Sequence, residues 1–335
     1  MDDAQTRITV LGSGSWGTAL AKLMADQGYP TRLWARRDEH AQSIQQSREN
    51  AQYLPGFKLP PALQATSDLQ EALHDAEMVI SVVPSQSTRS VWTQGRAYIP
   101  AGVPIFCASK GIENESLQMM LTVLKETVPD QPTGFVGGPS FAKEVAAQLP
   151  TAIVVAAEDE ALAKKAQTLM SCSWMRTYIT HDVVGVEMGG ALKNVIAIAC
   201  GIADGLGLGH NTRAALITRG LAELTRAAVR QGADPLTLAG LAGMGDLVLT
   251  CTGDQSRNRR VGIGLGKGRS LQEILDEMGQ VAEGVKTTLS AQQLAEKLGV
   301  DMPITHEMHR ILYQQEPAQA AVKRLMMRTL KHEAQ

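Results

Sequence analysis

Short apolar runs without polar alternation recur along the first half of the chain, separated by polar and helix-forming segments. Runs of this kind are typical of strands buried on both faces of a parallel sheet. The segments predicted as strands are Ile8–Leu11, Thr31–Ala35, Met78–Val83, Pro104–Ala108, Phe135–Val136, Thr151–Ala156 and Met175–Ile179. Because helices alternate with these strands, we expect an α/β domain with a doubly wound parallel sheet over residues 1–181. Residues 50–61, rich in Pro and Gly, are expected to form a loop.

The strand pattern stops at Asp182, and the rest of the chain is patterned as helices. Asp182 is expected to cap a long apolar-rich segment from Val183 to about Leu206. Asn211 is expected to cap the next helix, Thr212–Gln231. These signals predict an all-α C-terminal domain over residues 182–335.

Gly12, Gly14 and Gly17 follow the first predicted strand in G-x-G-x-x-G spacing, and a helix-forming segment comes after them. In a dinucleotide-binding turn the first glycine permits the tight turn, the second admits the pyrophosphate against the backbone, and the third lets helix and strand pack closely. The N–H groups and the positive dipole at the start of the helix complete an anion site. The spacing alone also fits a glycine-rich turn with no ligand, but the strand–turn–helix context favours a dinucleotide-binding, Rossmann-type domain.

The end of the second predicted strand bears on which dinucleotide is bound. A carboxylate there accepts a hydrogen bond from the ribose 2′-hydroxyl of NAD, whereas an arginine accommodates the 2′-phosphate of NADP. Arg36 and Arg37 occupy this place and are followed by Asp38. We interpret Asp38 as the N-cap of the helix Glu39–Gln46 rather than as a ribose ligand. The two arginines therefore favour NADP as the preferred cofactor over NAD.

The composition narrows the class of protein. The chain has 335 residues, 44% hydrophobic and 20% charged, with a formal net charge of -2, which fits a two-domain globular protein and argues against broad nucleic-acid binding. The cysteines have no metal-ligand spacing, so we expect no metal site and free thiols in a reducing cytoplasm. The acidic N-terminus has no signal-peptide pattern, and no apolar run approaches the roughly 20 residues that span a bilayer. We expect a cytoplasmic protein with no membrane span.

Lys193 lies in the middle of an apolar segment, where a surface lysine would have polar neighbours. Its neighbours one turn away are Gly189, Gly190, Ile196 and Ala197. An ammonium in such surroundings either reaches the surface along its stem or faces a cleft. Desolvation lowers the pKa of a lysine toward the range useful in general acid/base catalysis. The pattern alone leaves open whether Lys193 is catalytic or only fills a gap between helices.

Two further segments place polar groups beside apolar ones. Asp246 follows Gly243-Met244-Gly245, and an aspartate beside glycine most often only makes a turn. Ser256, Arg257 and Asn258 lie at a predicted helix start. They would form a phosphate grip there, because a guanidinium and free N–H groups both favour an oxyanion. A solvated charged turn is the alternative interpretation of this segment.

Eight segments, in order along almost the full chain, carry a resemblance to a known family. They are GSGSWGTALA (12–21), SVVPS (81–85), ASKGIE (108–113), GGPSFAKEVA (137–146), GGALKNVIAIACGIADGLGLGHNTRAALITRGLAE (189–223), GMGDLVLTCTGDQSRNRRVG (243–262), VAEGVKT (281–287) and MPIT (302–305). With these segments the chain resembles the bacterial NAD(P)-dependent glycerol-3-phosphate dehydrogenases. Residues 50–61 and the tail after Gln314 carry little of the resemblance.

The resemblance implies reversible interconversion of sn-glycerol 3-phosphate and dihydroxyacetone phosphate with NADP or NAD, supplying glycerophospholipid biosynthesis. By matched position, Lys193 is the general acid/base of that family. The matched substrate contacts are Lys110, Gly138, Ser140, Lys193, Asp246, Ser256, Arg257 and Asn258. The matched cofactor contacts, beside Gly12, Gly14 and Gly17, are Ser15, Trp16, Arg36, Arg37, Lys110, Ala142, Arg257, Val281 and Glu283. Ser140 stands where threonine is also found, which keeps the hydroxyl, and a homodimer is expected by analogy with the family.

Two other interpretations make different demands on the sequence. The β-hydroxyacid or 6-phosphogluconate type of dehydrogenase shares a helix lysine, but that family has a Lys-x-x-x-Asn pair on one helix face. Here Lys193 and Asn194 are adjacent, about 100° apart around a helix. An NADP-binding redox sensor without catalysis would lack the lysine or the arginine segment, and both are present.

Overall fold

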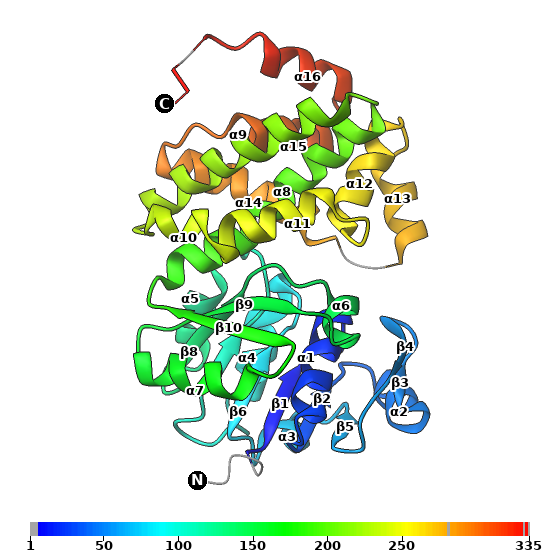
Figure 1. The fold of residues 1–335 in the computed structure, drawn as a ribbon, viewed down its shortest axis with the longest axis vertical. Coiled ribbons are helices and arrows are strands. Elements are labelled where there is room, and N and C mark those ends of the chain that lie inside the picture. Colours follow the sequence, from blue (N-terminus) through cyan, green and yellow to red (C-terminus); the bar gives the residue numbers. More distant parts are fainter. Residues whose placement is uncertain (1–5, 280–281, 331, 334–335) are drawn as a thin grey trace.

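The computed structural model describes residues 6–279, 282–330 and 332–333, and Figure 1 shows a sheet-containing N-terminal part below a group of helices. The strands are β1 (Ile8–Leu11), β2 (Thr31–Trp34), β3 (Glu49–Asn50), β4 (Leu54–Lys58), β5 (Leu63–Thr66), β6 (Met78–Ser81), β7 (Ile105–Cys107), β8 (Thr133–Gly137), β9 (Thr151–Ala156) and β10 (Met175–Thr180). In these residues one eight-stranded sheet has the order β10-β9-β8-β7-β6-β1-β2-β5. The predicted α/β class is confirmed, and the strand order reverses beside β1, where sheets of this type bind ligands.

The sheet departs from the prediction in two places. β8 pairs with β9 in antiparallel register, whereas the sequence pattern predicted a fully parallel sheet. The segment between them holds only the five-residue helix α6 (Ala142–Ala146), whereas a parallel crossover usually contains a longer helix that packs on the sheet. The other departure is the predicted loop 50–61, which contains most of an antiparallel hairpin of β3 and β4.

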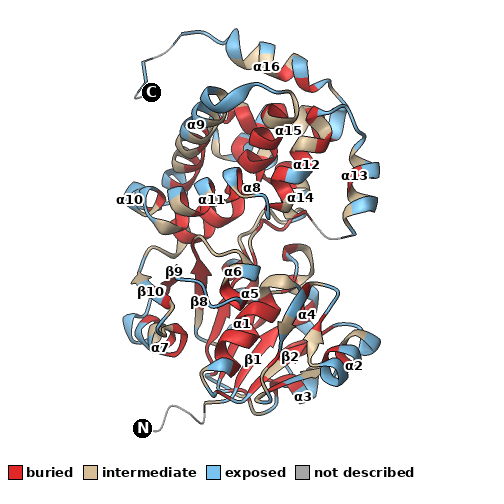
Figure 2. Ribbon diagram, turned by 45° about the vertical axis from the view of Figure 1, so that its right-hand side comes forward, coloured by how far each residue is buried: buried red, intermediate tan, exposed pale blue. Residues whose placement is uncertain are grey.

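Helices cover both faces of the sheet, and alternate residues of one strand point to opposite apolar clusters. The helical elements are α1 (Ser15–Asp26), α2 (Asp38–Ser47), α3 (Leu69–Leu73), the 3-10 turn η2 (Ser85–Ser87), α4 (Thr88–Gly95), α5 (Met120–Thr127), α6 and α7 (Glu160–Met170). Val10 of β1 packs in one cluster with Leu20 of α1, whereas Leu11 packs in the other with Trp92 of α4. Figure 2 shows β1 as buried, and all residues of the central strands β1, β6 and β7 are buried. Burial on both faces explains why the central strands are nearly continuous apolar runs.

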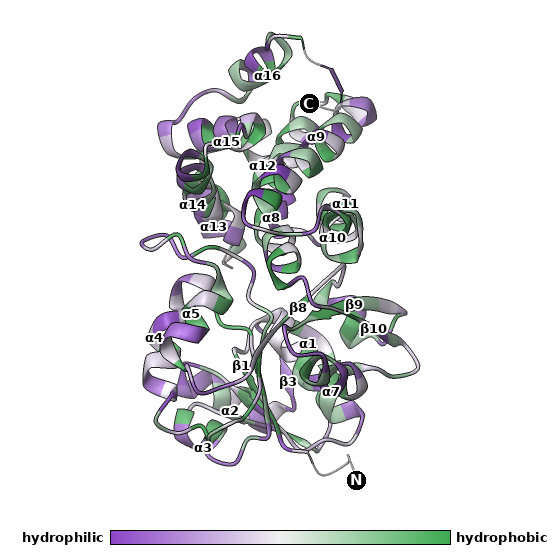
Figure 3. Cartoon of the chain, turned by 90° about the vertical axis from the view of Figure 1, so that its left-hand side faces the viewer, coloured by the Kyte–Doolittle hydropathy of each residue, from purple (hydrophilic) through white to green (hydrophobic). Residues whose placement is uncertain are grey.

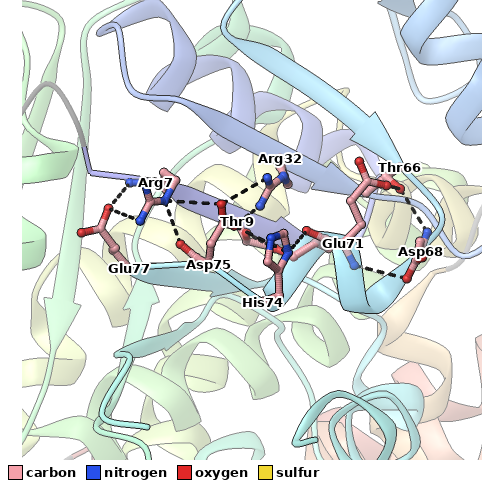
Figure 4. A network of polar contacts seen from close by, with 10 residues as sticks. Arg7, Thr9, Arg32, Thr66, Asp68, Glu71, His74, Asp75 and Glu77 are labelled. Carbon is pink, nitrogen blue, oxygen red and sulfur yellow. Dashed lines mark hydrogen bonds and ion pairs between the residues drawn. The ribbon is translucent and has the colours of Figure 1, made fainter. Parts of the chain in front are cut away.

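A polar network closes the amino ends of the central strands (Figure 4). Arg32 of β2 pairs with Asp75, and Arg7 donates from Nε to the Asp75 main-chain oxygen at 2.9 Å. The hydroxyl of Thr9 donates to the Ala72 main-chain oxygen at 2.5 Å. These contacts tie β1 and β2 to the segment before β6. The opposite, carboxyl ends of the central strands β1 and β6 face the helical part.

The helical part is built around one buried helix. Its elements are α8 (Val183–Gly205), α9 (Gly209–Arg230), α10 (Pro235–Ala239), the π-helical turn η3 (Leu241–Gly245), α11 (Asp246–Thr252), α12 (Arg257–Gly266), α13 (Leu271–Met278), α14 (Glu283–Leu298), α15 (Pro303–Gln314) and α16 (Ala318–Met326). In the described residues α8 is the one helix long and apolar enough to cross a bilayer, but 89% of its apolar window is buried inside the protein. Figure 3 shows hydrophilic and hydrophobic colours together on α9 and α15, as expected of helices with one face in solvent.

Two of the predicted helix caps can be compared with the helix starts. Asp182 accepts a hydrogen bond from the Gly185 N–H at 2.8 Å and caps α8, as predicted. The prediction that Asn211 caps the following helix is wrong, because α9 already begins at Gly209. Gly209 has φ +79°, a backbone conformation that favours glycine, so the turn between the two helices is tighter than the sequence suggested.

Glycines let α8 and α12 approach until their backbones touch. A Cβ on Gly201 would lie 2.1 Å from the Arg259 carbonyl oxygen, and one on Gly262 would lie 2.1 Å from the Ile198 carbonyl oxygen. One turn further along, Cβ atoms on Gly205 and Gly266 would meet backbone of the opposite helix in the same way. This glycine seam brings the start of α12 to the side of α8.

Candidate active site

The glycine motif leaves room for a ligand at its second position. A Cβ on Gly12, which has φ +115°, would lie 2.6 Å from the Val82 carbonyl oxygen. A Cβ on Gly17 would lie 1.8 Å from the Gly12 carbonyl oxygen. At Gly14, by contrast, no described atom other than those of Gly14 and its two chain neighbours lies within 4 Å of where a Cβ would be. Packing therefore requires the first and third glycines, and the second borders open space at the N-terminus of α1, where the motif predicts the pyrophosphate.

The hairpin of β3 and β4 is fastened to this turn. The Ser15 hydroxyl donates to the Tyr53 main-chain oxygen at 2.6 Å. The Asn50 amide donates to the Ser13 main-chain oxygen at 2.8 Å and to the Thr18 hydroxyl at 2.7 Å. Asn50 is fully buried although it lies in a polar segment, so the hairpin forms one wall of the candidate cofactor site. The sequence interpretation missed this wall, because its contacts lie far apart along the chain.

Arg36 and Arg37 follow β2 and are exposed beside the hairpin. Arg37 donates from Nη2 to the Gln52 side-chain oxygen at 2.9 Å. The prediction that Asp38 is an N-cap is wrong, because α2 begins at Asp38 and its N-cap is Arg37. The Asp38 carboxylate instead accepts hydrogen bonds from Ser67 and from an amide one turn along α2, both at 2.7 Å. It is held by protein partners, and a carboxylate in the first turn is favourable toward the helix dipole.

Lys110, Lys193 and Asp246 meet where the two halves of the chain face each other. Lys110 follows β7, Lys193 lies in the middle of α8 and Asp246 begins α11. Lys110 Nζ donates to Asp246 Oδ2 at 2.6 Å, and Lys193 Nζ donates to Asp246 Oδ1. Lys193 is 6% exposed and Asp246 is 1% exposed. When Lys193 is protonated, the cluster thus holds three charges with a net charge of +1, two of them on buried side chains.

The surroundings move the pKa of both buried members of this cluster. Burial lowers the pKa of Lys193 to about 7; the Asp246 carboxylate opposes this shift, and the Lys110 ammonium adds to it. Burial by itself would raise the pKa of Asp246, but the ammonium groups of Lys110 and Lys193 outweigh burial and lower it. Lys193 can therefore hold or release a proton near neutral pH while Asp246 stays ionised.

Thr250 is a further partner of Lys193 that the sequence interpretation missed. Lys193 Nζ donates to the Thr250 hydroxyl at 2.8 Å, and that hydroxyl donates to the Asp246 main-chain oxygen at 2.6 Å. Thr250 lies one turn after Asp246 in α11, so i, i+4 spacing was the available signal. Protein atoms fill the space beside Gly189, because a Cβ there would lie 2.7 Å from the Ala242 carbonyl oxygen.

Gly138 and Ser140 lie beside the lysine cluster. The Gly138 main-chain oxygen is 3.5 Å from Lys110 Nζ and also accepts a hydrogen bond from the Ser140 hydroxyl at 3.1 Å. Gly138 has φ +106°, and a Cβ there would lie 3.2 Å from the backbone of Ile153. The turn that presents the Gly138 carbonyl oxygen to Lys110 therefore favours glycine.

The segment Ser256–Asn258 forms the start of α12, as predicted. The Ser256 hydroxyl accepts a hydrogen bond from the Arg259 N–H at 3.2 Å and caps the helix. The Asn258 amide donates to the Asn194 side-chain oxygen at 2.9 Å and accepts from the Gly284 N–H at 3.0 Å. Within the described part of the chain, no hydrogen bond or ion pair fixes the Arg257 guanidinium, which is half-buried. This guanidinium is therefore free to bind an anion.

The remaining predicted cofactor residues are Trp16, Ala142, Val281 and Glu283. Glu283 begins α14 and accepts a hydrogen bond from the Ser85 hydroxyl at 2.8 Å, and burial raises the pKa of Glu283. The Trp16 indole N–H is buried and has no hydrogen-bond partner among the described residues. Ala142 begins α6, and Val281 lies outside the described residues.

The described residues of this site form no metal-binding cluster and no disulfide. Among the described residues no group of three His, Cys, Asp or Glu side chains is placed to hold a metal ion. The cysteines are free thiols: Cys107, Cys200 and Cys251 are buried, and Cys172 is partly exposed.

Comparison with known proteins gives full-length matches. The family model for the NAD-dependent glycerol-3-phosphate dehydrogenase N-terminus matches residues 7–163, and that for the C-terminus matches residues 182–323. The chain is 51% identical over 330 residues to the NAD(P)+ glycerol-3-phosphate dehydrogenase of Leptospira biflexa, covering 98% of this chain and 99% of the relative. It is 54% identical to that of Geobacter sp. strain M21, covering 98% of each. The crystal structure of glycerol-3-phosphate dehydrogenase from Coxiella burnetii is similar, with a TM-score of 0.94 and 41% identity over 97% of this chain and 100% of that one.

Proposed function

This chain belongs to the NAD-dependent glycerol-3-phosphate dehydrogenase family, and we propose that Lys193, held by Asp246, exchanges the proton in its reaction. The chain is an oxidoreductase that interconverts sn-glycerol 3-phosphate and dihydroxyacetone phosphate with NAD or NADP. The observation that carries the assignment of roles is the buried cluster of Lys110, Lys193 and Asp246 between the two halves of the chain.

The residues at the carboxyl ends of the strands fit a dinucleotide. Open space beside Gly14 lies at the N-terminus of α1, and Arg36 and Arg37 are exposed at the end of β2. When bound, the reduced nicotinamide supplies the hydride that adds to C2 of dihydroxyacetone phosphate. Residues 1–181 would then hold the cofactor, and residues 182–335 would supply most of the substrate site.

Lys193 would balance the charge that develops during reduction. As C2 gains the hydride, its carbonyl oxygen gains negative charge, and a bond forms between this oxygen and a proton of the Lys193 ammonium while the N–H bond breaks. Asp246 keeps the ammonium in place, and the net charge of +1 on the cluster favours the developing oxyanion. In the reverse direction, neutral Lys193 would accept the proton of the C2 hydroxyl.

The phosphate of the substrate would bind at the start of α12. Arg257 has a free guanidinium there, and the first N–H groups of a helix favour an anion. Ser256 and Asn258 shape the turn through their own contacts, and Lys110 and Ser140 would complete the substrate site near the reacting carbon.

Several wider features belong to the same proposal. We place the enzyme in the cytoplasm, as a homodimer that supplies glycerol 3-phosphate to glycerophospholipid synthesis. The full-length family match supports the reaction class from which these features are inferred.

One assay separates this function from the two alternatives. A dehydrogenase of the 6-phosphogluconate type, or a sensor without catalysis, would give no oxidation of NADPH that depends on dihydroxyacetone phosphate.

Replacing Lys193 should remove turnover and its pH dependence. Lys193→Ala is expected to bind cofactor nearly as well as the wild type but to lose about 100-fold or more in kcat. Because burial holds the pKa of Lys193 at about 7 in the free enzyme, wild-type kcat/KM for reduction should fall as pH rises through about 7, and kcat/KM for oxidation should rise. Steady-state assays in both directions measure this, with Lys267→Ala as an exposed-lysine control. A variant that keeps more than roughly a tenth of wild-type kcat would exclude Lys193 as the proton donor.

Replacing Arg257 should weaken recognition of the phosphate. Arg257→Ala is expected to raise KM for dihydroxyacetone phosphate, because alanine cannot replace the charge-assisted hydrogen bonds of a guanidinium. Activity with unphosphorylated dihydroxyacetone should change little. Arg260→Ala, an exposed arginine on the same helix, is the matched control. Equal losses on both substrates in Arg257→Ala would contradict the assignment.

Cofactor preference tests the role of Arg36 and Arg37. One charge-assisted contact to the 2′-phosphate contributes roughly 1.5–3 kcal/mol, or about a tenfold to hundredfold preference. We expect kcat/KM to be higher with NADPH than with NADH, and the double variant Arg36→Ala, Arg37→Ala to narrow the ratio mainly by raising KM for NADPH. Equal wild-type values, or an unchanged ratio in the double variant, would show that the 2′-phosphate is not recognised here.

A further inference from the structure

We infer that the ion pair between Asp204 and Arg259 positions the phosphate-binding turn of α12 relative to Lys193. Asp204 lies near the end of α8, and Arg259 lies in the first turn of α12. Arg259 Nε and Nη2 lie 2.8 and 2.7 Å from Asp204 Oδ2. The two side chains are about one-tenth exposed, so water competes little for this contact. The inference rests on the proposed function, because it concerns the site assigned to the phosphate.

The glycine seam explains why α12 needs such a contact. Side-chain ridges normally interlock and fix how one helix lies along another. Between α8 and α12 the closest positions are glycines, among them Gly201 and Gly262, so the two surfaces are smooth where they touch. A guanidinium held through two nitrogens is directional, and it fixes both the sliding and the rotation of α12 on α8.

The position of Arg259 links this contact to the substrate site. Its main-chain N–H donates to the Ser256 hydroxyl at 3.2 Å, so its backbone belongs to the turn that presents Arg257. Its side chain contacts Asp204 of α8, and the same helix carries Lys193. At a rise of 1.5 Å per residue, Lys193 lies about 16 Å along the helix from Asp204. The ion pair thus sets the separation between the phosphate-binding turn and the proton donor.

Asp204 is itself held from its other side, which supplies a matched control. Arg213 of α9 donates from Nε to Asp204 Oδ1 at 2.9 Å, and α9 carries none of the proposed substrate contacts. Arg213 and Arg259 therefore bind the same carboxylate, but only Arg259 connects it to α12. If the carboxylate acted through stability alone, replacing either arginine would have similar consequences.

The test compares Arg259→Lys with Arg213→Lys, since lysine keeps the charge but loses the two-nitrogen geometry. With NADPH as cofactor, Arg259→Lys should raise KM for dihydroxyacetone phosphate about tenfold, because the phosphate-binding turn is displaced but not removed. Its kcat should stay within about twofold, and kcat/KM for unphosphorylated dihydroxyacetone should be unchanged. Arg213→Lys should change none of these constants by more than about twofold. Lengthening the carboxylate in Asp204→Glu, Arg259→Lys should restore part of the loss in KM.

Asp204→Asn is the second variant. If Arg259→Lys does not fold, the KM of Asp204→Asn for dihydroxyacetone phosphate tests the positioning role in its place. A lowered Tm with unchanged KM, or equal losses on both substrates, would overturn the inference and leave the pair a structural contact. If Arg257→Ala distinguishes the two substrates and Arg259→Lys does not, the positioning role alone fails. If the wild type shows no turnover of dihydroxyacetone phosphate, the proposed function itself fails.

Discussion

One buried carboxylate holds the site together. Asp246 is shared by two ammonium groups, one from the sheet-containing half of the chain and one from α8, so a single side chain joins the halves where the reaction is proposed. Removing a buried carboxylate would leave two positive charges facing each other without a partner, which is strongly unfavourable in a dry environment. The geometry of Lys110 and Lys193 therefore depends on Asp246 more than on the loop after β7 or on α8 alone.

The helix that carries Lys193 makes the low pKa possible. α8 is buried along most of its length, and its apolar surroundings disfavour a charged lysine. A lysine with a pKa of about 7 can donate a proton in one direction and accept it in the other at neutral pH. Close packing also keeps water away from α8, because its glycines let Ala242 and the start of α12 contact its backbone directly.

The sequence predicted local features better than contacts between distant segments. The apolar runs, the glycine motif and the cap at Asp182 are local patterns, and each appears where it was expected. The interpretation of Asp246 as a turn residue is wrong, because Asp246 begins α11. Its partners were also missed, because Lys110 lies 136 residues away. Sequence periodicity does not report tertiary packing. Three further features arise from such packing: the antiparallel pairing of β8, the hairpin beside the glycine turn, and the contact of Thr250 with Lys193.

The pKa of Lys193 is the quantity on which the account most directly depends. A pH titration by NMR of protein labelled at the lysine Cε carbons would follow it, with Lys193→Arg used to identify the signal. The wild-type midpoint should lie near 7, and in Asp246→Asn it should fall further, because the carboxylate that favours the ammonium is gone while Lys110 remains. A midpoint close to the ordinary lysine value of about 10.4, or one unmoved by Asp246→Asn, would contradict the account.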